Sequence, residues 1–334
     1  MKARNLRITF ALMVAGMLAG CGGPSLIKAE DPPALETPPG EPAVTEHWSV
    51  SLGAATPPGY RLEPALMDER VFAAGADGTV AAYDAASGER RWRQDLDAAI
   101  TGAVGVGEAG VALGTANAEV VLLDPDSGAV KWRQRVSSEV LAPPAVGQGS
   151  VVVRTGDGGV FALEADTGEQ RWLYRSGVPA LSLRGHGSPV LVNGGVVVGF
   201  DNGRLAALEL GNGDVAWEAS VAVPEGRSDL ERMVDLDADP AVAGGDVFAG
   251  AYQGRVAGIA LANGQIAWTR EVSVLGGISV DDSNVYVTDE RGRLWAFDRR
   301  NGASVWRLGA LEGLSLTALR RYRAGLSVAG RVGY

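Results

Sequence analysis

The stretch Thr79-VAAYDAASGERR-Trp92 is the first of six segments that share one pattern. Each segment has a short apolar run, then a glycine, and ends at a tryptophan four residues after that glycine. The other five are Glu119-VVLLDPDSGAVK-Trp132, Gly159-VFALEADTGEQR-Trp172, Arg204-LAALELGNGDVA-Trp217, Arg255-VAGIALANGQIA-Trp268 and Arg293-LWAFDRRNGASV-Trp306. Successive tryptophans are 38 to 51 residues apart, and a period of this length indicates a repeat architecture.

Each unit predicts about four short strands. An alternating run such as Val80–Tyr83 predicts a half-buried strand. The following Ser87-Gly88 step predicts a hairpin turn with positive φ at the glycine, and the tryptophan then lies on the next strand. Upstream stretches such as Val151–Arg154 supply the remaining strands. Four-stranded units with this period predict an all-β fold, a β-propeller of four-stranded blades.

Six equivalent tryptophans favour an architectural role, a wedge between blades, over a stacking platform for a ligand. A WD40 propeller is disfavoured because neither a Trp-Asp step nor a Gly-His step recurs in the repeats. A solenoid is the other alternative, but it would need polar capping units. We therefore expect six to seven propeller blades over residues 47–334.

The N-terminus predicts a targeting segment. Basic residues precede the apolar stretch Ile8–Leu18, which is too short to span a bilayer and is typical of a signal peptide. It ends in Leu-Ala-Gly-Cys21, which resembles the lipobox of bacterial lipoproteins, and Cys21 is the only cysteine. We expect residues 1–20 to be removed and Cys21 to be lipidated; the alternative is an ordinary signal peptide with a chance cysteine. Residues 21–46, rich in Pro and Glu, predict an extended tether.

The formal net charge of −10 disfavours nucleic acid as a partner, because a phosphate backbone would repel the chain. With no cysteine after Cys21, the body of the chain has no thiolate metal site, and we expect no metal and no cofactor.

The repeat resembles that of pyrroloquinoline-quinone-type propellers, a superfamily with enzymes and non-enzymes. Two long segments, Pro179-ALSLRGHGSP-Val190 and Arg227-SDLERMVDLDADP-Ala241, resemble the inter-blade loops of the BamB family. These are lipoprotein subunits of the outer-membrane β-barrel assembly machinery. Such loops also account for the two longest tryptophan spacings, and extra residues on one face of a repeat array usually mark a binding face.

The resemblance implies a lipid-anchored scaffold on the periplasmic side of the outer membrane. It would bind the periplasmic domains of BamA, the barrel-forming subunit, and aid folding and insertion of outer-membrane proteins. It could also offer strand edges to unfolded outer-membrane proteins by β-augmentation. By motif, the residues implicated in binding BamA are Leu181, Leu183 and Arg184 in the first loop, and Asp235 and Asp237 in the second.

The residue types alone leave a structural alternative open. Leu181 and Leu183 would share one side of an extended segment and could anchor a partner, but they could also pack into the core. Asp235 and Asp237 could hold Arg184, or could cap turns before Pro240.

An enzyme similar to the quinoprotein dehydrogenases is the alternative function, and a ligand-binding propeller is a third. The dehydrogenases are longer, and they bind quinone and calcium in the central funnel. Only two histidines are present, and no carboxylates cluster at ion-ligand spacing. We therefore expect no catalysis.

The chain departs from the family in one respect. The resemblance implies eight blades, whereas six Gly…Trp units are present and the sequence stops soon after Trp306. We therefore expect a C-terminally truncated, incomplete ring; the alternative is a ring that closes with fewer blades. The segment His47–Leu52 is similar to the strand that completes the last blade of such rings, and it would then have no sheet to join.

Overall fold

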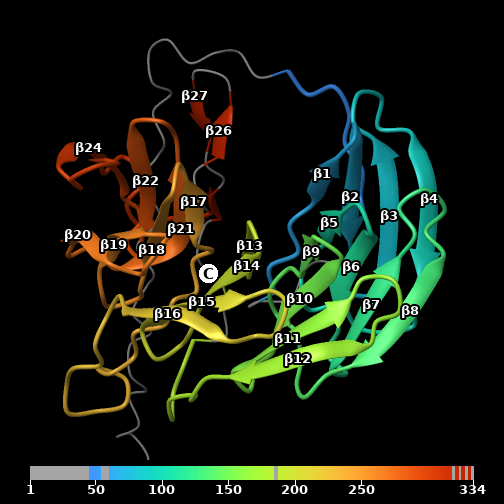
Figure 1. Ribbon diagram of the computed structural model, residues 1–334. Helices are drawn as coiled ribbons and strands as arrows, with labels where there is room; N and C mark the ends of the chain where they lie inside the picture. The colour runs from blue at the N-terminus through green and yellow to red at the C-terminus, as the bar shows by residue number, and fades with distance from the viewer. Residues whose placement is uncertain are drawn as a thin grey trace, which may run out of the picture. The chain divides into compact units, whose positions relative to one another are not determined.

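The computed structural model describes residues 45–53, 60–183, 187–317, 320–322, 325–327 and 330–331. Every regular element in these residues is a β-strand. The first 24 strands form six four-stranded antiparallel sheets, the blades, which follow one another along the chain (Figure 1). Within the described ranges, no helix of the length and apolar character needed to cross a bilayer is present.

Each blade is an up-and-down sheet with its strands in chain order. Blades one to three contain β1 (Ala65–Met67), β2 (Arg70–Ala74), β3 (Thr79–Asp84), β4 (Arg90–Asp95), β5 (Gly105–Gly107), β6 (Gly110–Gly114), β7 (Glu119–Leu123), β8 (Val130–Arg135), β9 (Ala145–Gly147), β10 (Ser150–Arg154), β11 (Gly159–Glu164) and β12 (Gln170–Arg175). Blades four to six contain β13 (Val190–Val192), β14 (Gly195–Gly199), β15 (Arg204–Glu209), β16 (Val215–Ser220), β17 (Ala241–Ala243), β18 (Asp246–Gly250), β19 (Val256–Ala260), β20 (Ile266–Arg270), β21 (Val274–Val280), β22 (Asn284–Asp289), β23 (Leu294–Asp298) and β24 (Ser304–Leu308).

Four short strands follow the sixth blade. They form two antiparallel pairs, β25 (Ser315–Leu316) with β28 (Gly330–Arg331), and β26 (Arg320–Tyr322) with β27 (Gly325–Ser327). The predicted β-propeller architecture is confirmed, and the ring of blades is open.

The hydrophobic core lies between neighbouring blades. One cluster joins the first blade to the second through Phe72, Val80, Trp92, Val111 and Leu123. The third strand of a blade is buried nearly throughout, as in β3 and β11. The prediction that this strand is half-buried is therefore wrong, because both of its faces are covered. In an inner blade the two neighbouring blades cover them, and in the first blade the second blade and the segment with Trp48 do so.

Each joint between blades is made by a tryptophan and the hairpin of the next blade. Trp172 donates its indole N–H to the carbonyl of Leu210 at 2.8 Å. In the same hairpin Gly213 has a φ of 79°, and a Cβ there would come within 2.7 Å of the Trp172 ring. The same two contacts recur for Trp92 with Pro125 and Gly128, Trp132 with Ala165 and Gly168, Trp217 with Leu261 and Gly264, and Trp268 with Arg299 and Gly302. The tryptophan is thus a wedge between blades, as the repeat predicts.

A β-bulge precedes every repeat tryptophan. In the first blade Ala82 pairs with Trp92 and Tyr83 pairs with Arg90, so Arg91 has no partner on β3. The other five blades show the same shift in register. Because a bulge bends its strand and increases the local twist, it helps to aim the tryptophan at the next blade.

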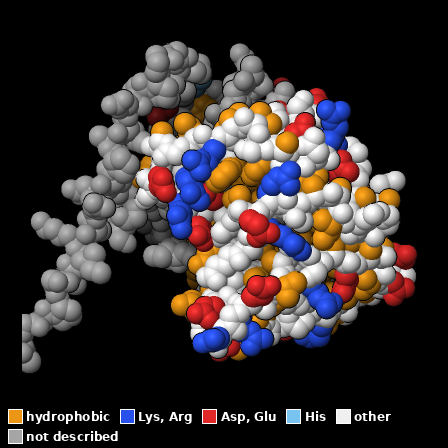
Figure 2. All heavy atoms as spheres, turned by 90° about the vertical axis from the view of Figure 1, so that its left-hand side faces the viewer, with side chains coloured by type: hydrophobic (Ala, Val, Ile, Leu, Met, Phe, Trp, Pro, Cys, Tyr) orange, Lys and Arg blue, Asp and Glu red, His pale blue; other side chains and the backbone are white. Residues whose placement is uncertain are grey.

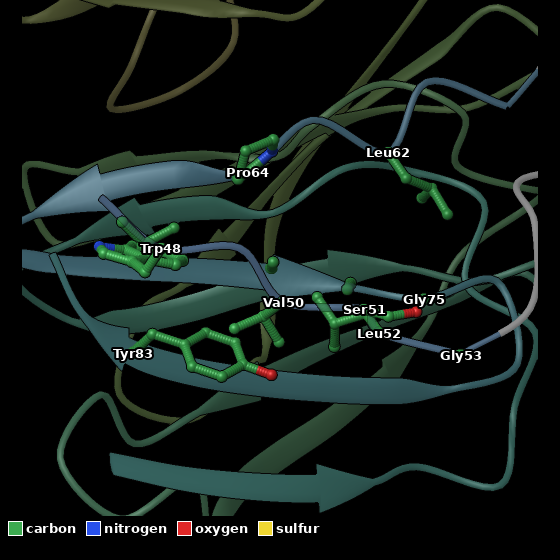
Figure 3. A pocket seen from close by; sticks show the side chains of 12 residues that line it. Trp48, Val50, Ser51, Leu52, Gly53, Leu62, Pro64, Gly75 and Tyr83 are labelled. Atoms are coloured by element: carbon green, nitrogen blue, oxygen red, sulfur yellow. The ribbon is translucent and has the colours of Figure 1, made fainter. Parts of the chain in front are cut away.

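Trp48 covers the first blade as the tryptophan of a preceding blade would. Its indole N–H donates to the carbonyl of Ala85 at 3.0 Å, and its ring lies where a Cβ on Gly88 would come within 2.6 Å. Residues 45–53 form no strand, in agreement with the expectation that this segment has no sheet to join. Trp48, Val50 and Leu52 line a groove of about 530 Å³ against the first blade (Figure 3).

The sixth blade has an exposed outer strand. All five residues of β24 are exposed, and Trp306 is 37% exposed whereas the other five repeat tryptophans are 7–8% exposed. Figure 2, which shows the left-hand side of Figure 1, has apolar side chains at the surface among charged side chains of both signs.

Candidate functional site

The first long loop (residues 176–189) connects blades three and four, the second (residues 221–240) connects blades four and five, and both contact the turn from β14 to β15. Asn202 in this turn donates its side-chain N–H to the carbonyl of Gly177 in the first loop at 3.3 Å. Gly203 accepts the N–H of Ala222 in the second loop at 3.1 Å. A third contact joins the N–H of Leu236 to the carbonyl of Phe200 at 3.3 Å. The fourth blade therefore brings the two loops together at the same end of the sheets.

Carboxylates of the second loop hold the backbone of the first. Asp235 accepts the N–H of Leu183, and Asp239 accepts the N–H of Ser188 at 2.7 Å. At Gly187 the loops approach so closely that a Cβ would come within 3.0 Å of the carbonyl oxygen of Leu236. The two loops thus form one joined surface with a fixed mutual register.

Arg61, which precedes the first blade, also contacts this surface. Its guanidinium makes two hydrogen bonds to Asp239, at 2.6 and 3.2 Å, across 178 residues of sequence. Burial lowers the pKa of Arg61, but the charge and hydrogen bonds of Asp239 outweigh this effect and leave the pKa well above its ordinary value. For Asp239, burial raises the pKa, but the opposite charge of Arg61 outweighs this effect and leaves the pKa below its ordinary value. Both groups are therefore charged at neutral pH.

A buried charged pair lies close to the loops. Arg154 ends β10, Asp201 follows β14, and their side chains form an ion pair with only 1% and 2% of their surfaces exposed. The guanidinium carbon lies 5.5 Å from the centre of the Phe200 ring, within the range of a cation–π contact. Removal of either partner of this buried pair should destabilise the fold, because the other partner would be an uncompensated charge in an apolar environment.

Asp235 and Asp237 are buried next to this pair. Asp235 is fully buried and Asp237 is 8% exposed. Burial and the neighbouring charge of Asp201 raise the pKa of Asp237 to about 9, and Arg154 only partly opposes this. Burial likewise raises the pKa of Asp235 to about 7, although the Leu183 N–H lowers it. At neutral pH, Asp237 is therefore mostly the neutral acid, because a carboxylate there would lack solvation.

The sequence-predicted site residues have different environments. Leu181 is 42% exposed, whereas Leu183 is partly buried and is held by Asp235. Arg184 and the lipidation residue Cys21 lie outside the described residues. The structure thus brings Leu183 and Asp235 into direct contact, and it places Asp235 and Asp237 beneath the surface of the loops.

Sequence reasoning missed Arg61, Arg154, Asp201 and Asp239. Arg154 and Asp201 each follow an apolar run, Val151–Val153 and Val196–Phe200. A charged residue at the end of a buried strand was the available signal. No local signal pointed to the Arg61–Asp239 pair, because its two members are 178 residues apart in the sequence.

Comparison with known proteins identifies the family. The family model described as outer membrane protein assembly factor BamB matches residues 45–308. The outer membrane protein assembly factor BamB of Alkalilimnicola ehrlichii is 47% identical over an alignment of 339 positions, which covers 100% of this chain and 86% of that protein. The chain belongs to the BamB family. The repeat, the two loops and the propeller fold agree with this assignment, so the resemblance seen in the sequence is confirmed.

Solved structures agree at the level of the fold. The crystal structure of BamB from Moraxella catarrhalis has a TM-score of 0.77 at 27% identity, over 80% of this chain and 82% of that one. The quinohemoprotein alcohol dehydrogenase of Comamonas testosteroni has a TM-score of 0.59 at 13% identity, over 78% of this chain and 62% of that one. At that identity the likeness shows the propeller fold alone.

Proposed function

We propose that the chain is a non-catalytic scaffold subunit of the outer-membrane β-barrel assembly complex, and that it binds the periplasmic domains of BamA through its two joined loops. Membership of the BamB family supports the first part. The observation that carries the second is the joining of the loops, with Leu181 exposed beside a backbone that Asp235 and Asp239 hold in place. A surface held rigid before binding pays little ordering entropy when a partner docks.

Within this proposal the predicted residues have two roles. Leu181 contacts the partner, and Arg184, three residues later in the sequence, offers a guanidinium to a carboxylate or backbone carbonyls. Asp235 is buried and accepts the N–H of Leu183, so it acts as a positioning residue that fixes the course of the first loop, and Asp237 is buried close to it.

We further propose that a lipid on Cys21 anchors the chain in the outer membrane, with residues 21–46 as the tether to a propeller that faces the periplasm. The Leu-Ala-Gly-Cys21 motif supports this, and mass spectrometry of the membrane-extracted protein tests it. A Cys21 that carries no acyl chain would contradict the anchor while leaving the partner proposal untouched.

The absence of catalysis is also part of the proposal. Among the described residues, the carboxyl groups with raised pKa values are Asp235 and Asp237, and burial keeps both from direct contact with a substrate. Quinone or calcium bound at stoichiometric amounts in the purified protein would contradict this and favour a dehydrogenase.

The binding test is a pull-down with the separately produced periplasmic domains of the cognate BamA. The double variant Leu181→Ala/Arg184→Ala should recover much less BamA than the wild type. Leu66→Ala on β1 is the matched control, because Leu66 is an exposed leucine outside the two loops. Undiminished recovery of BamA by the double variant would count against the proposal.

A further inference from the structure

The second loop has a protruding part and a buried base. Residues 223–232 are all exposed, whereas the next six residues, 233–238, are all buried. The buried base includes Met233, Val234 and Leu236 and contains Asp235, which holds the first loop. The protruding part is therefore fixed at its C-terminal end to the core of the propeller.

A capped turn gives the protruding part a defined conformation. The carboxylate of Glu231 accepts the backbone N–H of Arg227 at 2.7 Å and that of Ser228 at 3.2 Å. In return, the Ser228 hydroxyl accepts the N–H of Glu231 at 3.3 Å, and the N–H of Arg232 donates to the carbonyl of Ser228 at 3.2 Å. The sequence Ser-Asp-Leu-Glu at 228–231 thus forms a capping box, which satisfies the free donors at the start of a turn reciprocally.

The capped turn holds an apolar side chain in solvent. Leu230, between the two capping residues, is 60% exposed. Val223, where the protruding part begins, is exposed as well, and so is Val178 in the first loop. Val178 and Val223 each follow a residue bonded to the turn from β14 to β15, and the capped turn is joined to the first loop through Asp235, five residues after Leu230 in the sequence. Because the capped turn already holds Leu230 in its exposed position, a partner could contact this leucine without first ordering the turn.

We propose that the turn Ser228–Arg232 is a second contact point for the protein partner of the two loops, and that Leu230 inserts into an apolar pocket on that partner. This rests on the proposed function, and it adds a contact that the resemblance does not assign. The partner is a folded protein surface with a recess for one aliphatic side chain, on the same protein that receives Leu181. The capping box keeps Leu230 in its projecting position before binding.

The test measures the dissociation constant of the periplasmic domains of BamA for the full propeller by biolayer interferometry. Burying one leucine is worth about 1.5–3 kcal/mol, so Leu230→Asp should weaken binding on the order of tenfold to a hundredfold, mainly through faster dissociation. Leu66→Asp is the matched control, because Leu66 is 68% exposed and lies in the first blade, and it should bind like the wild type. Far-ultraviolet circular dichroism checks that both variants are folded.

Variants of the cap separate positioning from contact. Glu231→Ala keeps Leu230 but removes the acceptor, so it should weaken binding, whereas Glu231→Gln retains an acceptor oxygen and should restore most of the affinity. Equal binding by Glu231→Ala, Glu231→Gln and the wild type would overturn the positioning role.

The outcomes distinguish the two levels of the proposal. If the wild type does not bind BamA, the proposed function fails and this inference fails with it. If Leu181→Asp weakens binding but Leu230→Asp does not, the inference alone is overturned. If Leu230→Asp leaves BamA binding unchanged but abolishes self-association in light scattering, the occupant of this surface is a second copy of the chain, and the inference is likewise wrong.

Discussion

Replacing Asp237 by asparagine should remove a large part of the pH dependence of stability. An aspartate in an unfolded chain titrates near pH 3.9, whereas burial raises the pKa of Asp237 to about 9 in the folded protein. Folding therefore takes up a proton at this residue between these two pH values. The stability that depends on this proton is fully present below about pH 4. It is lost progressively as the pH rises from there, and the loss is complete above the folded-state pKa of about 9.

The magnitude follows from proton linkage. One proton taken up on folding lowers the free energy of unfolding by about 1.4 kcal/mol for each unit of pH increase. From pH 6 to pH 8 the wild type should therefore lose up to about 2.7 kcal/mol at Asp237, and asparagine, which does not titrate, should lose none of it. Asp235 is present in both proteins, so its contribution largely cancels in the comparison.

The assay is urea unfolding followed by tryptophan fluorescence at pH 6, 7 and 8 and constant ionic strength. Asp239→Asn is the matched control from the same loop. Asp239 has a pKa below its ordinary value, so it is ionised throughout this range, and its replacement should leave the pH slope of the wild type intact. If the wild type and Asp237→Asn show parallel pH dependences, Asp237 is not the neutral acid and the reasoning is refuted.

Three further predictions concern the stability of the blades, each measured by urea unfolding at pH 6. Trp172→Phe leaves a carbonyl of the next blade without its indole donor and should cost about 2–4 kcal/mol, whereas Trp306→Phe, at an exposed ring for which the described residues show no such bond, should cost less than about 1 kcal/mol. Gly168→Ala places a methyl group 2.7 Å from an indole at a φ of 76° and should cost about 2 kcal/mol or more; Gly177→Ala, with nothing within 4 Å, should cost less than about 0.5 kcal/mol. Asp201→Asn leaves a buried arginine without its carboxylate and should cost about 3–5 kcal/mol, and equal stability of variant and wild type would show that the pair is dispensable.

The blade architecture could be predicted because it depends on short-range patterns repeated six times. The glycine before each tryptophan has φ values of 67° to 79°, as the hairpin requires, and this preference is a property of the residue itself. Repetition then distinguishes the pattern from chance, since Trp132 and Gly168 recur in equivalent contacts in the other joints. The spacing of the tryptophans also located the two long loops correctly.

The candidate site was only partly predictable. The resemblance named Asp235 and Asp237, but nothing in the local sequence showed that both are buried beneath the loop surface. The exposure of Leu230 was missed as well, although the residues on either side of it form a recognisable capping pattern. In each case the environment of the side chain depends on segments far away in the chain.

The sequence by itself determined the blades, their turns and their wedges, because dihedral preferences and hydrophobic periodicity act between residues only a few positions apart. Only the tertiary structure decided which charges meet and which are buried. Arg61 reaches Asp239 across 178 residues, and the pKa of Asp237 is raised because neighbouring blades remove water from around it. Solvation and Coulomb interactions depend on distance in space, and the folded chain alone sets those distances.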